Sequence, residues 1–135
     1  MSADQQYSIN LDEAFGPLEL VDVRALADAV EDRWHNQTLC RVNDCVIRLG
    51  VMQGEFHWHH HDEEDEFFYV VEGRFLIDLE EDRTVELGPR QGFMAPRGVV
   101  HRTRAPERTV ILMTEGAGVV PTGDATEEPV QGATT

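Results

Sequence analysis

Four histidines and five consecutive acidic residues stand together in the stretch HWHHHDEEDE, residues 57–66. The chain has six histidines in all, so most of its imidazole groups lie in this one segment. Imidazole binds Zn, Fe, Ni, Cu and Mn well enough that the residues alone do not choose among these ions. The stretch is therefore either part of a metal site or a charged loop that follows some aromatic residues.

An extended backbone would sort these histidines by face, because side chains alternate along a strand. His57, His59 and His61 then share one face, while Phe56 and Trp58 fall on the other face and are expected to pack or to contact a second subunit. Two imidazoles two residues apart on an inward face can bind one ion together. A strand is favoured over a helix because the neighbouring segments are apolar and β-branched.

Two further groups could complete such a site. Glu66 begins the apolar run FFYVV and could place a carboxylate beside the histidine pair. His101 follows the segment PRGVV, residues 96–100, whose turn could aim one more imidazole into the same space. His60 points away from the pair, and the acids Asp62–Asp65 are expected to form a solvated turn whose negative charge favours a cation.

These residues resemble the two motifs of the cupin superfamily. The first motif, H-x-H-x(3–4)-E-x(6)-G, falls on His59, His61, Glu66 and Gly73. The second, G-x5-P-x-G-x2-H-x3-N, falls on Pro96, Gly98 and His101. The resemblance implies that His59, His61, Glu66 and His101 bind one divalent transition metal ion, which could be Fe, Mn, Ni or Zn.

The sequence departs from these motifs at three positions that are not metal ligands in the family. The glycine of the first motif falls on Gln53, with Gly54 one place late. Arg90 stands at the glycine of the second motif, where it would resist a positive φ, and Ala105 stands at the terminal asparagine.

The rest of the chain supplies the elements that must position this site. Apolar and β-branched segments at residues 38–42, 45–52, 67–71, 75–79, 84–87 and 110–113 are separated by turn-forming residues, which is typical of an all-β sandwich or barrel. Residues 21–34 have helical spacing, with Asp22 as the cap. We expect an N-terminal segment with a short helix at 1–35, a barrel at 36–115 and an extended or disordered tail at 116–135. The resemblance specifies the barrel as a jelly-roll, the double-stranded β-helix of cupins.

Side chains around the expected metal define a cavity. Phe68 and Val70 share the face of Glu66, and Phe75 and Ile77 are their expected companions in the wall. His57 lies on the same face as the ligands, so it is the candidate general base or a group that orients a ligand. The alternative is a hydrogen-bonded histidine of the barrel.

The charge and cysteine content of the chain limit the kinds of partner and the cellular location that we expect. The formal net charge of −15 repels nucleic acid phosphates and anionic membrane surfaces, so we expect neither as a partner. Cys40 and Cys45 form no zinc-binding spacing, and Cys45 is expected in the core. No signal peptide or bilayer-spanning run is recognised, so a cytoplasmic protein is expected.

Three functions fit these observations. The resemblance extends to small bacterial single-domain cupins described as mannose-6-phosphate-isomerase-like or quercetin-dioxygenase-like, and it implies a homodimer. The first function is a dioxygenase, and the second is a metal-assisted isomerase or lyase with His57 as base. The third is a non-catalytic module that binds a small ligand or a metal. Arg48, Arg74, Arg97 and Arg102 are scattered along the chain and form no cluster for a phosphate, which argues against a phosphosugar substrate.

Overall fold

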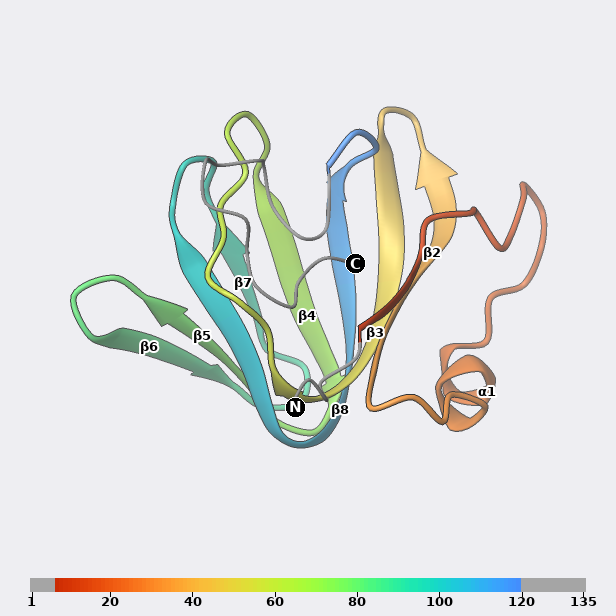
Figure 1. The fold of residues 1–135 in the computed structure, drawn as a ribbon. Coiled ribbons are helices and arrows are strands. Elements are labelled where there is room, and N and C mark those ends of the chain that lie inside the picture. The colour runs from red at the N-terminus through yellow and green to blue at the C-terminus, as the bar shows by residue number, and fades with distance from the viewer. Residues whose placement is uncertain (1–6, 120–135) are drawn as a thin grey trace.

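The computed structural model describes residues 7–119, and the regular secondary structure of this part is almost entirely β-strand (Figure 1). The elements in chain order are β1 (Ser8–Asn10), α1 (Val23–Asp28), β2 (Trp34–Val42), β3 (Cys45–Glu55), β4 (Glu66–Glu72), β5 (Phe75–Leu79), β6 (Arg83–Leu87), β7 (Gly92–Ala95) and β8 (His101–Gly116). The predicted all-β class is confirmed. Within residues 7–119 no helix is long and apolar enough to cross a membrane.

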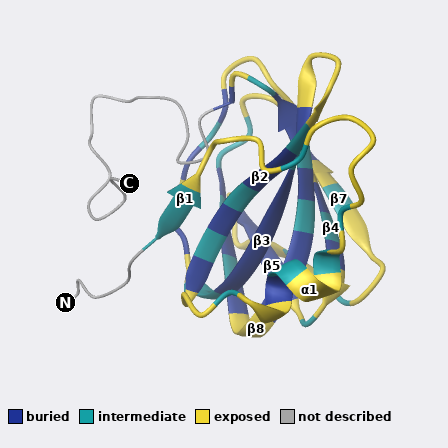
Figure 2. Cartoon of the chain, turned by 90° about the vertical axis from the view of Figure 1, so that its right-hand side faces the viewer, coloured by how far each residue is buried: buried dark blue, intermediate teal, exposed yellow. Residues whose placement is uncertain are grey.

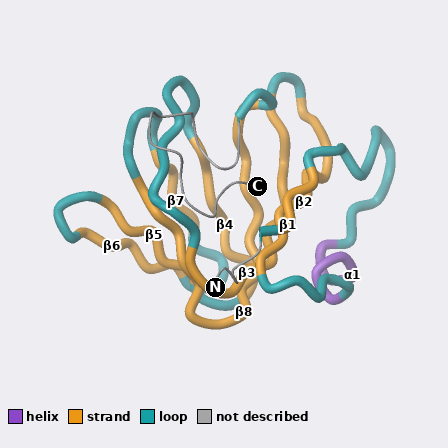
Figure 3. The backbone as a smooth tube through the Cα atoms, in the orientation of Figure 1, coloured by secondary structure: helices purple, strands orange, loops and turns teal. Residues whose placement is uncertain are grey.

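The strands form one strongly curved sheet (Figure 3). Its hydrogen-bonded order is β1-β2-β3-β8-β4-β7, and the β5–β6 hairpin joins it through β8. All of these pairs are antiparallel except β1 with β2. Strand β8 therefore pairs with three others, β3, β4 and β5, and residues placed along it can meet side chains from most of the molecule.

Alternation along the strands divides the apolar residues between two cores (Figure 2). The larger core lies inside the curve of the sheet and contains Trp34, Phe68, Phe75 and Ile111. The smaller core lies on the outer face of β2, β3 and β8, where α1 covers it. Cys45 belongs to neither core and is exposed, so its expected burial was wrong.

The helix is shorter than predicted, spanning Val23–Asp28 instead of residues 21–34. Its predicted cap is confirmed, since the Asp22 carboxylate accepts a hydrogen bond from the Ala25 amide at 3.0 Å. The chain leaves the helix early because Trp34 is the first residue of β2 and only 2% exposed in the inner core. Burial of this large side chain overrides the weak helical propensity of the preceding residues.

Strand β8 is longer than the predicted segment 110–113, and it includes Pro106, one of the turn-forming residues expected to precede that segment. Ala105 pairs with Gly54 and Thr109 pairs with Met52, so residues 106–108 fall in a gap of the β3–β8 register. The missing N–H of proline removes no ladder hydrogen bond there. The strand also includes Gly116, and the remainder of the predicted tail from residue 120 lies outside the described residues.

Two turns show why the motif positions matter. Gly73 has φ +99°, and a Cβ atom there would lie 2.7 Å from the Cα of Thr109, so only glycine fits without movement. Arg90 has φ 69°, so the turn requires the positive φ that a non-glycine residue resists. Its amide donates to the Val70 carbonyl at 2.8 Å, which holds this conformation in place.

Candidate metal centre

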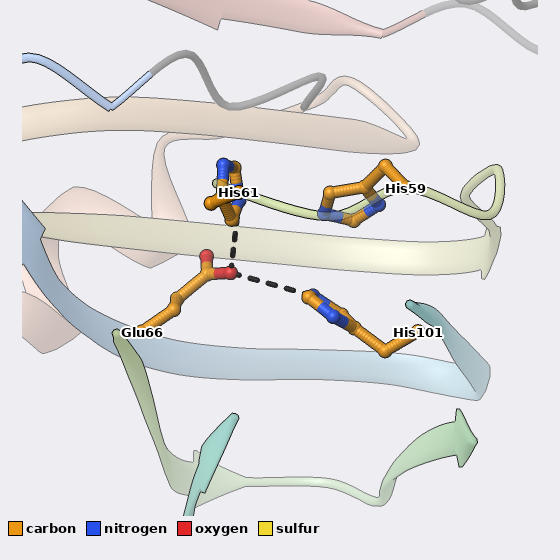
Figure 4. Close-up of side chains that lie close together, drawn as sticks. All are labelled: His59, His61, Glu66 and His101. Carbon is orange, nitrogen blue, oxygen red and sulfur yellow. Dashed lines mark ion pairs between the residues drawn. The ribbon is translucent and has the colours of Figure 1, made fainter. Parts of the chain in front are cut away.

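Three imidazoles and one carboxylate converge inside the curved sheet (Figure 4). One ligand atom from each of His59, His61, Glu66 and His101 lies within 4.8 Å of the others, and all four residues are buried. The distance from Glu66 Oε1 is 3.3 Å to His61 Nε2 and 3.5 Å to His101 Nε2. The structure thus brings together the four residues singled out in the sequence, which we call the His3Glu cluster.

The segment that carries the first two histidines is not a strand, contrary to our prediction. Strand β3 ends at Glu55 and β4 begins at Glu66, and between them only His59 makes a bridge. The backbone amides of His59 and His101 each donate to the carbonyl of the other at 2.9 Å. This bridge joins the two motifs directly.

The break in β3 also reverses our prediction for Phe56, which is buried and faces inward. Phe56 faces inward, as Met52 does four residues earlier. His59 and His61 also face inward, although a regular strand would place them on the face opposite to Phe56. One continuous alternation from Phe56 to His61 was therefore the wrong assumption. Trp58 is exposed, with the Arg102 guanidinium 5.3 Å from its ring centroid.

The turn before His101 is tied to the histidine segment. Gly98, at φ +80°, donates its amide to the His61 carbonyl at 2.8 Å. The Arg97 amide donates to the Asp65 carboxylate at 2.9 Å. The acids at 62–65 are exposed, as expected for a solvated turn, and His60 lies 3.0 Å from one of them, Asp62.

Backbone carbonyls orient two of the imidazoles. His59 Nδ1 lies 3.1 Å from the carbonyl of His57, and His101 Nδ1 lies 2.9 Å from that of Val99. A carbonyl can only accept, so in both rings Nδ1 carries the proton and Nε2 presents a lone pair. Metal-binding histidines commonly use this arrangement to fix the tautomer of the ring.

Several polar atoms of the cluster have no hydrogen-bond partner among the described residues. They are both ring nitrogens of His61, Oε1 of Glu66 and Nε2 of His101. A buried polar group left in this state destabilises a fold by about 1–3 kcal/mol. Unsatisfied imidazole and carboxylate atoms that face one point are the donor set that a divalent transition ion prefers, so the residues fit a metal.

Electrostatics favour the metal-binding protonation states of His59 and Glu66 but not that of His101. Burial, reinforced by the nearby His101, lowers the pKa of His59 to about 3. Burial alone would raise the pKa of Glu66, but the imidazoles of His101 and His61 beside it outweigh that effect and hold the pKa well below its ordinary value. Burial likewise opposes the charge of His101, yet the nearby Glu66 carboxylate raises the pKa of that imidazole. Near neutral pH, His59 is a neutral donor and Glu66 an anionic one.

A buried ion pair adjoins the cluster and was missed in the sequence. Glu115 on β8 lies directly across from Glu66 on β4, and its carboxylate accepts a hydrogen bond from Arg48 of β3. Arg48 also donates to the Thr38 hydroxyl at 3.1 Å. Burial and the charge of Glu66 raise the pKa of Glu115. An arginine on the inward face of an otherwise apolar strand was the available signal, because such a charge requires a buried partner.

A cavity opens beside the cluster. Its wall consists of Ile9, Trp34, Asn36, Met52, Phe56, His59, Glu66, Phe68, Phe75, Thr103 and Met113. The centre of a water molecule can move within about 20 Å³ of it, which is room for one water. Phe68 and Phe75 line this space, whereas Val70 and Ile77 are fully buried in the inner core and do not line it.

The predicted base lies beside the cluster but outside the cavity wall. The ring centroid of His57 is 5.3 Å from that of His59 and 4.2 Å from that of Phe56. His57 is half-buried and is not part of the His3Glu cluster. Asn36 and Thr103, which do line the cavity, were not singled out in the sequence, because an inward polar residue is visible only once the register of its strand is known.

Comparisons with known proteins agree with this architecture. A "Cupin domain" family profile matches residues 46–125. The chain is 40% identical over 97 residues to "Uncharacterized protein YdbB" of Bacillus subtilis (strain 168), covering 72% of this chain and 86% of that protein.

Solved structures show the same fold. A cupin-2 domain containing protein from Shewanella frigidimarina is 27% identical, with a TM-score of 0.68, covering 72% of this chain and 94% of its own. Protein NMB1881 from Neisseria meningitidis is 19% identical, with a TM-score of 0.66, and the match covers 73% of this chain and 99% of that protein. From its family match, its fold and its two motifs, the chain is a small member of the cupin family.

Proposed function

We propose that this cupin binds one divalent transition metal ion through His59, His61, Glu66 and His101 and uses it to act on a small organic molecule. The observation that carries the proposal is the set of unpartnered, buried ligand atoms that meet beside an apolar cavity. Four protein ligands leave positions open on a six-coordinate ion. When bound, such an ion supplies Lewis acidity and, if it is redox-active, chemistry with dioxygen.

The chain's own residues bind and orient the substrate in this scheme. The aromatic wall of Trp34, Phe56, Phe68 and Phe75 favours an apolar body and excludes water from the reacting end. The bridge between His59 and His101 holds two of the ligands in register. Glu66 provides the anionic ligand, and the imidazoles of His61 and His101 beside it keep it ionised.

Dioxygenase-like oxidation is the reaction class that we favour. Among the described residues of the cavity wall, the only titratable side chains are the ligands His59 and Glu66. Isomerisation and elimination need a separate base within hydrogen-bond reach of the substrate, whereas oxidation by dioxygen draws mainly on the metal. A metal-assisted isomerase or lyase is the second candidate, supported by the position of His57 next to His59.

A phosphorylated substrate fits poorly. No lysine or arginine lines the described part of the cavity. The arginines that we considered in the sequence are engaged elsewhere: Arg48 with Glu115, Arg74 with Glu86, Arg97 with Asp65, and Arg102 with Asp78. Phosphate recognition relies on such side chains, so we propose a substrate without a phosphate group.

Metal content tests the proposal. We would measure metals by plasma mass spectrometry in the untagged protein, in His59→Ala/His101→Ala and in His60→Ala, the control outside the cluster. We expect one equivalent in the wild type and in His60→Ala and none in the double variant. Iron, manganese or nickel would justify oxygen-uptake screens, and zinc alone would direct work to isomerase and lyase assays. No metal after reconstitution would contradict the proposal and leave a non-catalytic ligand-binding module.

The His57→Ala variant separates the two reaction classes. Loss of turnover with metal content intact would support an isomerase or lyase with His57 as base. Oxygen uptake that persists in the variant would support the dioxygenase, because that reaction does not require this imidazole. The substrates to screen are small enolisable and phenolic compounds without phosphate.

We also propose that the protein forms a homodimer. Phe67 and Met94 are opposite each other on β4 and β7 and are 40% and 47% exposed. Exposed apolar side chains that sit together mark contact surfaces more often than single ones do. Sedimentation of the wild type and of Phe67→Glu tests this: the wild type should be a dimer, and a monomeric wild type would contradict the proposal.

A further inference from the structure

One polar side chain in the cavity lies outside the His3Glu cluster and has an oxygen atom without a hydrogen-bond partner among residues 7–119. Asn36 is 6% exposed and lines the cavity together with His59 and Glu66. Its Oδ1 atom is buried without a hydrogen-bond partner among residues 7–119. The other polar residue of the wall outside the His3Glu cluster is Thr103 on β8.

The strands fix this amide in the cavity. Asn36 lies on β2 and pairs with Ile9 of β1 and with Gly50 of β3. Directly paired residues point to the same face, and the side chains of Met52 and Ile111 fill the place that a side chain on Gly50 would take, 2.5 and 3.0 Å from its Cβ position, so the neighbours of the amide are apolar. The rest of the wall around Asn36 is mostly apolar, with Trp34, Met52 and Phe56 among its members.

If the residue at this position contributed only to the stability of the fold, an apolar side chain would be expected there. An unpartnered amide in an apolar wall destabilises the native state, and an apolar side chain of similar shape would remove the penalty. A group that enters the cavity and donates a hydrogen bond to Oδ1 gives the amide a role. A hydroxyl group satisfies this requirement.

The two sides of the cavity indicate which chemical groups a ligand would carry. Its metal side can hold an anionic oxygen group, whereas its other walls carry no positive side chain in the described part of the chain. The free volume has room for about one water-sized group, so only the hydroxyl end of a ligand fits beside Asn36 while the rest extends toward the metal side. We propose that Asn36 binds the hydroxyl group of a short hydroxylated carboxylic acid whose carboxylate lies at the metal; this inference rests on the proposed metal site.

Paired probes test the assignment. Propanoate, butanoate and pentanoate would each be titrated calorimetrically into the manganese-loaded protein beside 3-hydroxypropanoate, 4-hydroxybutanoate and 5-hydroxypentanoate. In the wild type, the hydroxyl of the acid whose length matches the cavity should tighten binding about tenfold, as expected of one hydrogen bond. Asn36→Leu should abolish the preference for the hydroxylated acid. If Asn36→Leu does not fold, Asn36→Ala replaces it in the same measurement. Thr103→Val, in the same wall, should keep it.

The outcomes separate this inference from the metal site itself. If the wild type shows no preference at any chain length, or if Asn36→Leu retains it, Asn36 holds only a buried water and the inference is overturned. If the acids bind metal-free and metal-loaded protein equally, the carboxylate does not lie at the metal and the inference is likewise overturned. If the protein takes up no manganese, the proposed function fails instead.

Stability gives a readout that does not depend on probes. Removing an unpartnered amide should raise the melting temperature of metal-free Asn36→Leu by about 3–5 °C. A fall of that size would show that the amide has a structural partner and would overturn the inference. Metal content should be unchanged in the variant, because Asn36 is not a member of the His3Glu cluster.

Discussion

Two polar clusters lie on opposite faces of the first residues of β8. His101 points inward to the His3Glu cluster, while Arg102 and Arg104 point outward to the carboxylate of Asp78 on β5. Asp78 accepts hydrogen bonds from Arg104 at 2.7 Å, Thr84 at 2.8 Å and Arg102 at 2.9 Å. We call Asp78, Thr84, Arg102 and Arg104 the Asp78 cluster.

The two clusters differ in how many of their polar atoms have hydrogen-bond partners. Both carboxylate oxygens of Asp78 have partners, and hydrogen bonds led by that from Arg104 hold its pKa well below the ordinary value. In the His3Glu cluster, by contrast, Oε1 of Glu66 and Nε2 of His101 have no hydrogen-bond partner among the described residues. A closed network contributes to stability, whereas an open one contributes only when something else binds to it. The predictions below test that distinction.

The largest effect is expected where the His3Glu cluster meets the Arg48–Glu115 pair. Arg48→Met leaves Glu115 buried without its cation and should lower the free energy of unfolding by about 3–5 kcal/mol. Arg41→Met, which breaks the exposed pair with Glu13, is the control and should change it by less than about 1 kcal/mol. Urea unfolding measures both, and equal losses would show that the buried pair has no special weight.

Metal should stabilise the protein through the His3Glu cluster alone. At a free metal concentration 100 times the dissociation constant, the gain in unfolding free energy is about 2.7 kcal/mol. We expect this gain in the wild type and in Asp78→Asn but not in Glu66→Gln, measured as the difference between melts with metal and with chelator. A gain retained by Glu66→Gln would place the metal elsewhere.

The Asp78 cluster should matter for stability without metal. Asp78→Asn weakens the hydrogen bonds from two arginines and should lower the free energy of unfolding by about 2 kcal/mol, with metal content unchanged. Glu86→Gln, which alters an exposed pair with Arg74, should cost less than about 1 kcal/mol. Loss of metal in Asp78→Asn would mean that the two clusters are not independent.

Acidic pH should remove the stabilisation that the Asp78 carboxylate gives to the folded protein. Its pKa is lower in the folded protein than the ordinary value of 3.8, so its stabilisation is fully present above that pH and is lost as the pH falls below it. The difference in urea midpoint between the wild type and Asp78→Asn should be constant near neutral pH and shrink below about pH 3.8. A difference that grows in acid would contradict the sign of the shift.

The sequence contained the His3Glu cluster but not its surroundings. Its four members could be predicted because they lie in two short motifs whose spacing depends little on the rest of the fold. Asn36 and Glu115 could not, because the face that each side chain takes depends on the register between paired strands. Phe56 was placed on the wrong face because the end of β3 at Glu55 leaves no local signature.

The order of the ligands along the chain has a consequence for how the protein matures. His59, His61 and Glu66 lie within a few residues of one another, whereas His101 arrives only when the start of β8 joins the segment at His59. An unfolded chain therefore already offers a histidine pair to free metal, and metal held by the unfolded state weakens the drive to fold. Refolding should proceed best when the chain folds first and the ion is supplied afterwards.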